Sequence, residues 1–366
     1  MTAQVTLSDV AREAGVSLAT ASRALNGSAT RTVGEPLRLR VEDAARRLRY
    51  TPDGIAQAMA RGRTTSLGLV LPDITDPRYA TVASGVVAAA SAAGLTVALT
   101  VSGGEAEREV DLVQQMERQR ARGVVIVGGG RGAAGDEAEE PVRAALASFR
   151  ETGGGAAVIG RPGLGVDCVD AGESDAAVEL ARAMHGLGYR RVVLLAGTDR
   201  AAVRRGSALL RAFAELGMPL PEDRVIGCPP SREGGYRVVR DLLAAGVPVD
   251  LVAAVDDARA LGALAATREA RRAPGTPDGV AVSGFDGVEG SEVAIPPLTT
   301  VRVPYARLGE EAVALLLAAT DGRRPAASGT QAVPAPVEQT DGGSPRGRRR
   351  VRVPSEVVLR ASTSQD

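Results

Sequence analysis

The chain has 366 residues, of which 44% are apolar and 24% are charged, and its formal net charge is zero. This length and composition are those of an ordinary soluble globular protein with more than one folding unit. The two cysteines, Cys168 and Cys228, lack the spacing of a zinc site and exclude a disulfide framework. We find no signal-peptide pattern at residues 1–11 and no apolar stretch of about 20 residues, so we expect a cytoplasmic protein with no membrane partner.

Charge is distributed unevenly along the chain. Residues 1–63 contain ten Arg and six acidic residues, which gives this segment a net charge of +4 and the remainder −4. Every cation is Arg, because the chain contains no Lys. A cationic segment at one end of an otherwise anionic chain favours a polyanion partner at that end only.

Residues 6–50 are predicted to form three short helices. Thr6 can cap the first helix, which Gly15 ends, and Ser17 can cap the second. The third helix follows Pro36, because apolar residues recur after it at spacings of three and four.

Two helices joined by a tight glycine turn are typical of a helix-turn-helix DNA-binding domain. In such a domain the exposed N-terminal residues of the second helix reach base edges in the major groove, and polar residues beside them contact bases or phosphates. The residues at these positions are Leu18, Ala19, Thr20, Ser22 and Arg23. Spacing alone leaves open a generic three-helix domain.

From residue 66 onward, short apolar strands alternate with amphipathic helices. The expected strands are 67–71, 95–100, 124–127, 157–159, 192–195, 224–226, 251–254 and 280–283, and the expected helices are 79–93, 106–121, 174–187, 202–216, 233–245 and 257–271. Repeated βα units predict parallel sheets with helices on both faces. Residues 321–347 are rich in Pro, Gly and Ala and are expected to form a flexible insertion, which a strand at 351–359 follows.

The N-terminal sequence resembles the signature of LacI-family transcriptional regulators. The match runs from Val5 to Ser17, and continues through Thr20, Ser22-Arg23, Leu25-Asn26-Gly27 and Tyr50-Thr51-Pro52. The resemblance implies DNA contacts from Thr6, Ser17, Leu18, Ala19, Thr20, Ser22, Arg23 and Asn26. In that family Leu18 and Ala19 occupy the positions that most distinguish operators, so two small apolar residues imply readout by methyl contacts.

The segment after Pro52 resembles the family's hinge helix, which folds on operator DNA as a dimer. The resemblance assigns DNA contacts there to Ala56, Gln57 and Met59, with Met59 at the position of a Leu that wedges into the minor groove. Packing of Met59 between hinge and body is the alternative. Asp53 and Gln57 replace the usual Asn and Arg, which removes favourable groups near phosphate.

The body resembles the family's effector domain, which has two Rossmann-like lobes about a cleft, as in periplasmic sugar-binding proteins. The resemblance rests on Leu69 to Pro77, Gly188 to Val192, Asp257 to Gly262, Gly284 to Asp286 and Pro296 to Val301. We expect an all-α head at 1–52, a hinge at 53–64, a first lobe at 65–162 and 290–322, and a second lobe at 163–289 and 323–366 with the insertion at about 325–347.

Effector contacts carry over position by position from the family. The residues concerned are Asp73, Tyr79, Arg161, Arg205, Asp256 and Asp286. A salt bridge between the lobes, or a place on a solvated face, is the alternative for Arg205 and Asp286. Pro230 stands where sugar-binding members usually place a stacking aromatic, so either the effector is not a standard sugar or the pocket has lost its ligand.

The expected function is a sequence-specific regulator, a repressor, that binds a pseudo-palindromic DNA operator as a homodimer under the control of a small-molecule effector. A regulator that ignores ligands is the alternative. Residues 130–135 spell the GxGxxG of a dinucleotide site, but they follow the third strand rather than the first. His185 is the only His, so an enzyme is not expected, nor is a cofactor, and a solute-binding protein would need a signal peptide.

Overall fold

The computed structural model describes residues 5–26, 33–50, 63–128, 136–276, 278–321, 337–340 and 348–364. The chain divides into two compact units, a head within Met1–Thr65 and a body within Ser66–Asp366. The expected hinge contacts Ala56, Gln57 and Met59 lie outside the described residues, as does the GxGxxG sequence at 130–135.

The head contains the three predicted helices, α1 (Leu7–Glu13), α2 (Leu18–Asn26) and α3 (Glu35–Arg47). Its small core is built mainly from alanine and valine, which allow the helices to approach closely: Val10, Ala11, Ala14, Ala21, Ala24, Val41, Ala44 and Ala45. Thr6 and Asp9 form a capping box at the start of α1, in which Asp9 Oδ2 accepts from Thr6 N at 2.9 Å. Gly15, with a φ of +61°, makes the turn into α2.

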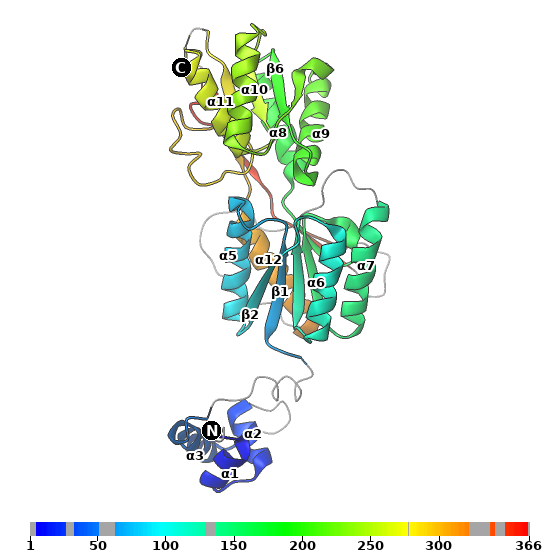
Figure 1. The fold of residues 1–366 in the computed structure, drawn as a ribbon, viewed down its shortest axis with the longest axis vertical. Helices are drawn as coiled ribbons and strands as arrows, with labels where there is room; N and C mark the ends of the chain where they lie inside the picture. The colour runs from blue at the N-terminus through cyan, green and yellow to red at the C-terminus, as the bar shows by residue number, and fades with distance from the viewer. Residues whose placement is uncertain are drawn as a thin grey trace. The chain divides into compact units, whose positions relative to one another are not determined.

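The body contains two lobes, each built on its own sheet (Figure 1). The first-lobe sheet has the order β11-β12-β5-β4-β3-β1-β2, with parallel pairing except between β11 and β12. Its strands are β1 (Ser66–Leu71), β2 (Thr96–Val101), β3 (Gly123–Val127), β4 (Gly155–Ile159), β5 (Asp167–Asp170), β11 (Val337–Thr340) and β12 (Arg349–Arg352). The central strands β3 and β4 are buried at every residue, as both faces of the sheet are covered.

Helices cover both faces of the first-lobe sheet. On one face, α5 (Pro77–Ala92) packs against α12 (Tyr305–Asp321), and on the other α6 (Ala106–Arg118) packs against α7 (Asp136–Glu151). Figure 1 shows α6 and α7 side by side and α5 next to α12. Among the helices that the structure describes, none is long and apolar enough to cross a membrane.

The second lobe repeats this design with a four-stranded parallel sheet, β7-β6-β8-β9. Its strands are β6 (Val192–Ala196), β7 (Val225–Gly227), β8 (Leu251–Ala254) and β9 (Ala281–Ser283). The helix pair α8 (Glu173–Gly186) and α9 (Arg200–Glu215) packs on one face, and α10 (Arg232–Ala244) with α11 (Asp257–Glu269) packs on the other. A two-stranded antiparallel ribbon, β10 (Thr300–Arg302) with β13 (Glu356–Val358), completes the body, and two 3₁₀ turns lie at Pro162–Leu164 and Glu222–Arg224.

The structure corrects two of the expected lobe boundaries. We expected residues 163–289 and 323–366 in the second lobe, but β5 pairs with β4, and β12 pairs with β5, in the first-lobe sheet. Both strands are short and flanked by charge, so they lack the apolar run that marks a buried strand. Their charges cancel across the pairing, since Asp167 Oδ2 accepts from Arg349 Nη2 at 2.6 Å and Asp170 pairs with Arg350.

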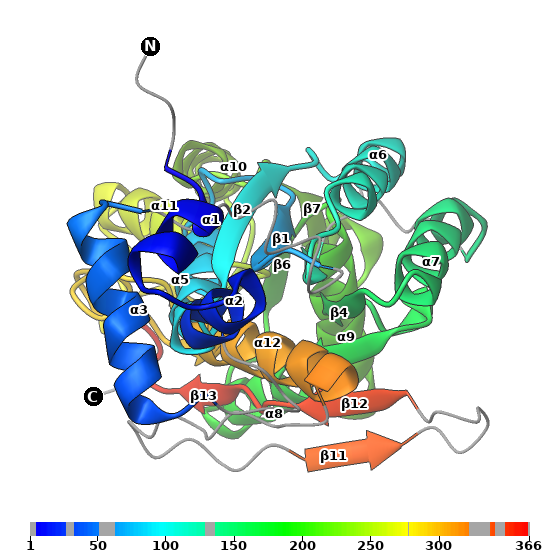
Figure 2. The ribbon, with the colours of Figure 1, turned by 90° about the horizontal axis from the view of Figure 1, so that it is seen from below.

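The region expected to be a single insertion and a single strand is also divided differently. Residues 337–340 of the expected insertion form β11, which pairs antiparallel with β12, and Figure 2 shows the two strands side by side. The strand expected at 351–359 is two strands, β12 and β13, in two different sheets. The chain then returns to the second lobe, where Ser362 O accepts from Val282 N at 3.0 Å.

Candidate DNA-reading helix and interlobe cavity

The N-terminus of α2 presents two small apolar side chains to solvent. Leu18 is 51% exposed and Ala19 is exposed beside it, whereas Ala21 and Ala24 anchor the opposite face of the helix in the head core. Ser17 precedes the helix, and its Oγ accepts from Thr20 N at 3.1 Å. The N-terminus of α2 is therefore capped while its apolar residues stay accessible.

The remaining predicted head contacts are partly engaged within the head. The Thr6 hydroxyl donates to Asp9 Oδ2 at 2.7 Å as part of the capping box. Arg23 is half-buried, and its Nη2 lies 3.5 Å from the Thr20 hydroxyl. Ser22 is also half-buried, and Asn26 is the last residue of α2.

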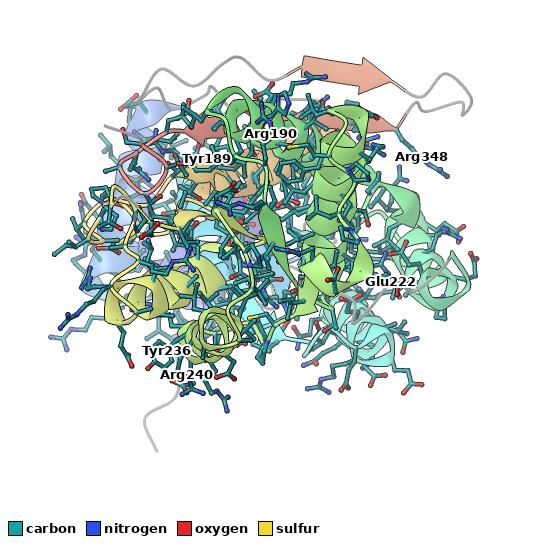
Figure 3. The ribbon with its side chains drawn as sticks, turned by 90° about the horizontal axis from the view of Figure 1, so that it is seen from above. Tyr189, Arg190, Glu222, Tyr236, Arg240 and Arg348 are labelled. Carbon is teal, nitrogen blue, oxygen red and sulfur yellow. The ribbon has the colours of Figure 1, made fainter. Side chains whose placement is uncertain are left out.

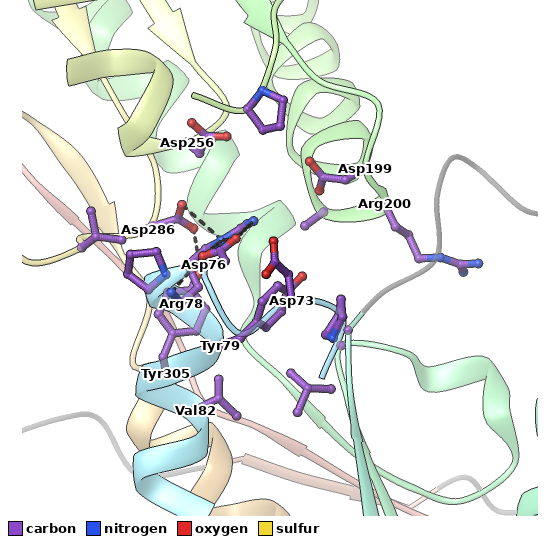
Figure 4. A pocket seen from close by; sticks show the side chains of 18 of the residues that line it. Asp73, Asp76, Arg78, Tyr79, Val82, Asp199, Arg200, Asp256, Asp286 and Tyr305 are labelled. Carbon is purple, nitrogen blue, oxygen red and sulfur yellow. Dashed lines mark hydrogen bonds and ion pairs between the residues drawn. The ribbon is translucent and has the colours of Figure 1, made fainter. Parts of the chain in front are cut away.

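The body contains a cavity of about 800 Å³ lined by residues of both lobes (Figure 4). The cavity lies at the carboxyl ends of the parallel strands, since its lining includes Gly128 after β3, Gly160 after β4 and Asp256 after β8. Open α/β sheets bind ligands at this edge, and the volume is within the range of small-molecule sites.

Arg205 and Asp286 form a buried ion pair at this cavity. Arg205 Nη1 lies 2.8 Å from Asp286 Oδ1, and the side chains are 1% and 3% exposed. Arg205 also donates to Glu173 Oε1 at 2.5 Å and to the Val255 carbonyl at 3.0 Å. Its guanidinium stacks on the Phe285 ring, with Cζ 4.4 Å from the ring centroid.

Two residues of the first lobe join this pair. The Tyr305 hydroxyl donates to Asp286 Oδ1 and accepts from Arg205 Nη2 at 3.1 Å, and Arg78 Nε lies 3.9 Å from Asp286 Oδ2. Arg78 is held in place by Asp76, whose Oδ2 accepts from Arg78 Nη2 at 2.6 Å. We refer to Arg78, Tyr305, Arg205 and Asp286 as the interlobe cluster.

The pKa values of the acids in this region reflect burial opposed by arginine. Burial raises the pKa of Asp286 to about 6, although Arg205 and Arg78 act in the opposite direction. Burial alone would also raise the pKa of Glu173, but Arg205 and Arg204 together lower it to about 2. Glu173 is therefore the fixed counter-ion of the two arginines, whereas the charge of Asp286 depends on the balance between burial and its arginine neighbours.

Asp256 and Asp257 occupy adjacent positions with different environments. Asp256 caps α11, where its Oδ1 accepts from Arg259 N at 2.8 Å, and it also pairs with the Arg259 guanidinium. Asp257 is fully buried, and it accepts from the Thr300 hydroxyl at 2.6 Å and from Val288 N at 2.9 Å. Burial, reinforced by the negative charge of Asp286, raises the pKa of Asp257 to about 8.

Of the six predicted effector contacts, five line the cavity: Asp73, Tyr79, Arg205, Asp256 and Asp286. Asp73 is exposed, and its Oδ1 accepts from Thr75 N at 2.8 Å. Tyr79 is half-buried, and burial raises its pKa to about 12. Pro230 also lines the cavity.

The sixth predicted contact, Arg161, does not line the cavity. Its side chain is 2% exposed and is bonded to two acids, Glu109 Oε2 at 2.6 Å and Glu139 Oε1 at 3.2 Å. Burying a guanidinium requires paired carboxylates. Here two helices supply them, so Arg161 joins α6 and α7 to the end of β4.

Sequence reasoning missed the residues that surround Arg205 and Asp286. Glu173, Arg78 and Tyr305 lie far apart in the chain, at the starts of α8, α5 and α12. The one available signal is that each stands close to the beginning of a helix that follows a strand or a lobe crossing.

Comparisons with known proteins agree with this architecture. Residues 6–53 match the family described as "Bacterial regulatory proteins, lacI family", and residues 181–363 match the "Periplasmic binding protein-like domain". The HTH-type transcriptional regulator GalR of Salmonella typhimurium is 31% identical over 317 residues, which are 86% of this chain and 89% of that protein. The HTH-type transcriptional regulator DegA of Bacillus subtilis is 27% identical over 99% of this chain and 98% of its own length.

Solved structures of related fold agree with this architecture. The lac repressor dimer bound to operator and the anti-inducer ONPF has a TM-score of 0.81 at 23% identity, covering 99% of each chain. A complex of the transcriptional regulator CelR with cellobiose has a TM-score of 0.63 at 27% identity, covering 98% of this chain and 100% of that one. The first likeness supports the predicted fold, a helical head with a two-lobed α/β body.

Proposed function

We propose that this chain, which belongs to the LacI family of DNA-binding transcriptional regulators, is a repressor. It binds a pseudo-palindromic operator as a homodimer and responds to a small molecule in the interlobe cavity. The observation that carries the proposal is the pair of exposed residues Leu18 and Ala19 at the capped N-terminus of α2. A helix-turn-helix regulator needs an accessible helix N-terminus at this position to reach base edges.

We propose that residues 1–52 form the DNA-binding unit and that Thr6, Ser17, Thr20, Ser22, Arg23 and Asn26 position it on the DNA. Leu18 and Ala19 then select the bases, through contacts with thymine methyl groups. Since neither side chain donates a hydrogen bond, discrimination by these two residues depends on shape and apolar contact.

We further propose that residues 53–64 act as a hinge on the DNA, with Ala56 and Gln57 in contact with it and Met59 inserted between bases of the minor groove. Insertion of an apolar side chain unstacks a base step and bends the duplex. Met59→Ala is expected to weaken binding to the operator more than binding to random DNA. Equal losses on both would refute insertion.

The effector is proposed to bind in the cavity, in contact with Asp73, Tyr79, Arg205, Asp256 and Asp286. These side chains come from both lobes, so a ligand that touches both can favour one lobe arrangement over another. A coupling of roughly 1–3 kcal/mol between the cavity and the DNA would change operator affinity about 5- to 150-fold.

The test of the function is a footprint of the full-length protein on the DNA upstream of its own coding region, repeated across salt concentrations and a metabolite panel. We expect a protected pseudo-palindrome and a steep loss of affinity with salt. Leu18→Ala should change the preferred sequence, whereas Leu39→Ala, which removes a 47%-exposed leucine from α3, should not. A protein with no preference for any palindrome over random DNA would contradict the proposal.

A regulator that ignores ligands is the second candidate. It is favoured by the pairing of Arg205 with Asp286, since two groups aligned with effector contacts already pair with each other. Under this candidate the footprint is obtained, but no metabolite in the panel alters it.

A further inference from the structure

The interlobe cluster joins residues that the fold draws from opposite lobes. Tyr305 begins α12 and Arg78 lies in the first turn of α5, both in the first lobe. Arg205 lies in α9 and Asp286 follows β9, both in the second lobe. Figure 4 shows Arg78 and Tyr305 on one side of Asp286, with dashed lines to the groups that they contact.

The Tyr305 hydroxyl uses its single proton and one lone pair on the second lobe. It donates to Asp286 Oδ1 and accepts from Arg205 Nη2 at 3.1 Å. Arg78, with a side chain 13% exposed, adds a positive charge 3.9 Å from Asp286 Oδ2. Buried interactions of this kind are stronger than the same contacts in water, because little solvent competes with them.

The two first-lobe residues also lie at the starts of two helices that pack backbone to backbone. Gly85 of α5 lies so close to α12 that a Cβ there would be 2.7 Å from the Ala306 carbonyl carbon. Gly309 of α12 lies equally close to α5, since a Cβ on it would be 2.8 Å from Val86 N. Backbones in direct contact leave the two helices little room to slide past one another, so we expect a displacement at the start of one helix to be passed to the other.

Two further contacts join the lobes near the cavity. Arg200 Nη1 lies 2.6 Å from Glu139 Oε1, and Arg204 Nη1 donates to the Gly160 carbonyl at 3.3 Å. Arg200 and Arg204 belong to α9 of the second lobe, and their partners belong to the first. Both contacts use outer arginines of α9, whereas the interlobe cluster uses the buried Arg205.

We propose that Tyr305 and Arg78 are positioning residues that hold the two lobes together through Asp286 in the absence of any ligand. In this arrangement the protein's own hydroxyl and guanidinium occupy Asp286. The inference extends to regulation, and this part rests on the proposed function. An effector with a hydroxyl or N–H donor acts by displacing Tyr305 from Asp286, which releases α12 and α5 together.

The test measures the distance between the lobes in the full-length chain without DNA or effector. Spin labels are placed on two exposed positions, Gln115→Cys on α6 and Ser207→Cys on α9, and labelled protein is diluted in unlabelled protein so that pairs within one chain are counted. The native Cys168 and Cys228 are buried, and labelling of protein that lacks the introduced cysteines measures their reaction.

The variants are Tyr305→Phe, which removes one hydroxyl, and Arg78→Gln, which removes one charge. The matched controls are Tyr236→Phe and Arg240→Gln, because Tyr236 donates to Glu269 at 2.6 Å and Arg240 pairs with Asp241 at 2.8 Å, all within the second lobe. Figure 3 shows Tyr236 and Arg240 together at the outside of α10.

We expect a single narrow distance distribution in the unmodified chain and in both controls. Tyr305→Phe and Arg78→Gln should increase the fraction of longer distances at least about threefold, as removing a state-specific contact shifts a two-state equilibrium. Circular dichroism identifies any variant that fails to fold, and Asp286→Ala then removes the same contacts from the other lobe.

The inference is overturned if Tyr305→Phe and Asp286→Ala give the same distance distribution as the unmodified chain, or if the distances in the unmodified chain are already broadly distributed. Because the measurement needs neither DNA nor metabolite, its failure is distinct from failure of the proposed function. If Tyr305→Phe broadens the distance distribution but the footprint finds no operator, the inference that the interlobe cluster holds the lobes together stands. Only the regulatory role of the cluster is then lost.

Discussion

Gly85 of α5 packs directly against the backbone of Ala306 in α12, which leaves no room for a side chain between the two helices. A Cβ on Gly85 would lie 2.7 Å from the Ala306 carbonyl carbon and closer still to its oxygen. The close packing of the two helices that carry Arg78 and Tyr305 therefore requires a glycine at position 85.

Gly85→Ala is expected to destabilise the body, because the added methyl group meets backbone atoms that cannot rotate away. Overpacking of this kind costs roughly 1–3 kcal/mol. Gly186→Ala is the matched control, since Gly186 ends α8 with open space around its missing side chain. Thermal unfolding should show a lower melting temperature for Gly85→Ala only, and equal melting temperatures would contradict the close packing.

Thr6→Ala is expected to loosen the head without affecting the body. The substitution removes the hydroxyl that joins Thr6 to Asp9 and accepts from Asp9 N at 3.4 Å. Loss of an N-cap side chain costs about 1 kcal/mol. Hydrogen exchange should increase in peptides from α1 and remain unchanged in β3 and β4, and Thr81→Ala on the exposed face of α5 provides the control. Faster exchange in the body would show that the effect is not local.

Asp257 is expected to make the body less stable as the pH rises. The pKa of Asp257 increases from 3.8 to about 8 on folding, because burial and the charge of Asp286 disfavour its carboxylate. A raised folded-state pKa contributes stability below the unfolded value that is lost progressively as the pH rises from about 4 to about 8. The melting temperature should therefore fall by several degrees between about pH 5 and about pH 8.

Asp257→Asn tests whether Asp257 causes this change of melting temperature with pH. An amide cannot ionise, so the variant's melting temperature should vary less with pH across the same range. At about pH 5 the variant should be the less stable protein, by about 1 kcal/mol, since an amide nitrogen cannot accept from Val288 N. An unchanged slope would assign the pH dependence to another group, such as Asp286.

Glu173→Gln is expected to destabilise the body more than the similar size of the two side chains suggests. Glu173 bonds Arg205 at 2.5 Å and also pairs with Arg204, and removing its charge leaves the buried Arg205 with one fewer carboxylate. Breaking a buried pair from one side typically costs about 3–5 kcal/mol. Glu233→Gln, which removes the exposed i,i+4 partner of Arg237, should cost less than about 1 kcal/mol. Denaturant unfolding distinguishes the two, and similar small losses would contradict the role of Glu173.

The pH dependence of Glu173 has the opposite sign to that of Asp257. Two arginines overcome the effect of burial and lower the pKa of Glu173 to about 2. Its contribution is therefore fully present above the ordinary value of 4.5 and is lost as the pH falls toward about 2. Acid unfolding of Glu173→Gln should be less steep than that of the unmodified chain.

Sequence alone predicted the elements whose residues repeat with a clear period. The three head helices and the alternation of strands and helices in the body are confirmed, because runs such as Val124 to Val127 are apolar at every position. The strands β5 and β12 were assigned to the wrong lobe. Charged residues such as Asp167 and Arg349 are typical of loops, and only the pairing of the two strands compensates their charges. Local pattern carries no information about a partner about 180 residues away.

The cavity was predictable in part for a similar reason. Motifs near Asp73, Asp256 and Asp286 follow strands, so their positions at one edge of a sheet could be inferred from parallel topology. Arg161 also follows a strand, but the two acids that take up its charge, Glu109 and Glu139, lie on helices whose orientation the sequence does not specify. The same limit hid Tyr305, whose role depends on a contact between lobes.

Residues 349–362 have a consequence for the order in which the body can fold. Strand β12 supplies the partner of β5 in the first lobe, and Ser362 bonds Val282 in the second. Because both contacts are made by residues 349–362, neither lobe can finish its hydrogen bonding before this segment has been synthesised. A chain cut short near residue 348 would lack β12 and the Ser362 contacts, so both lobes would be left incomplete.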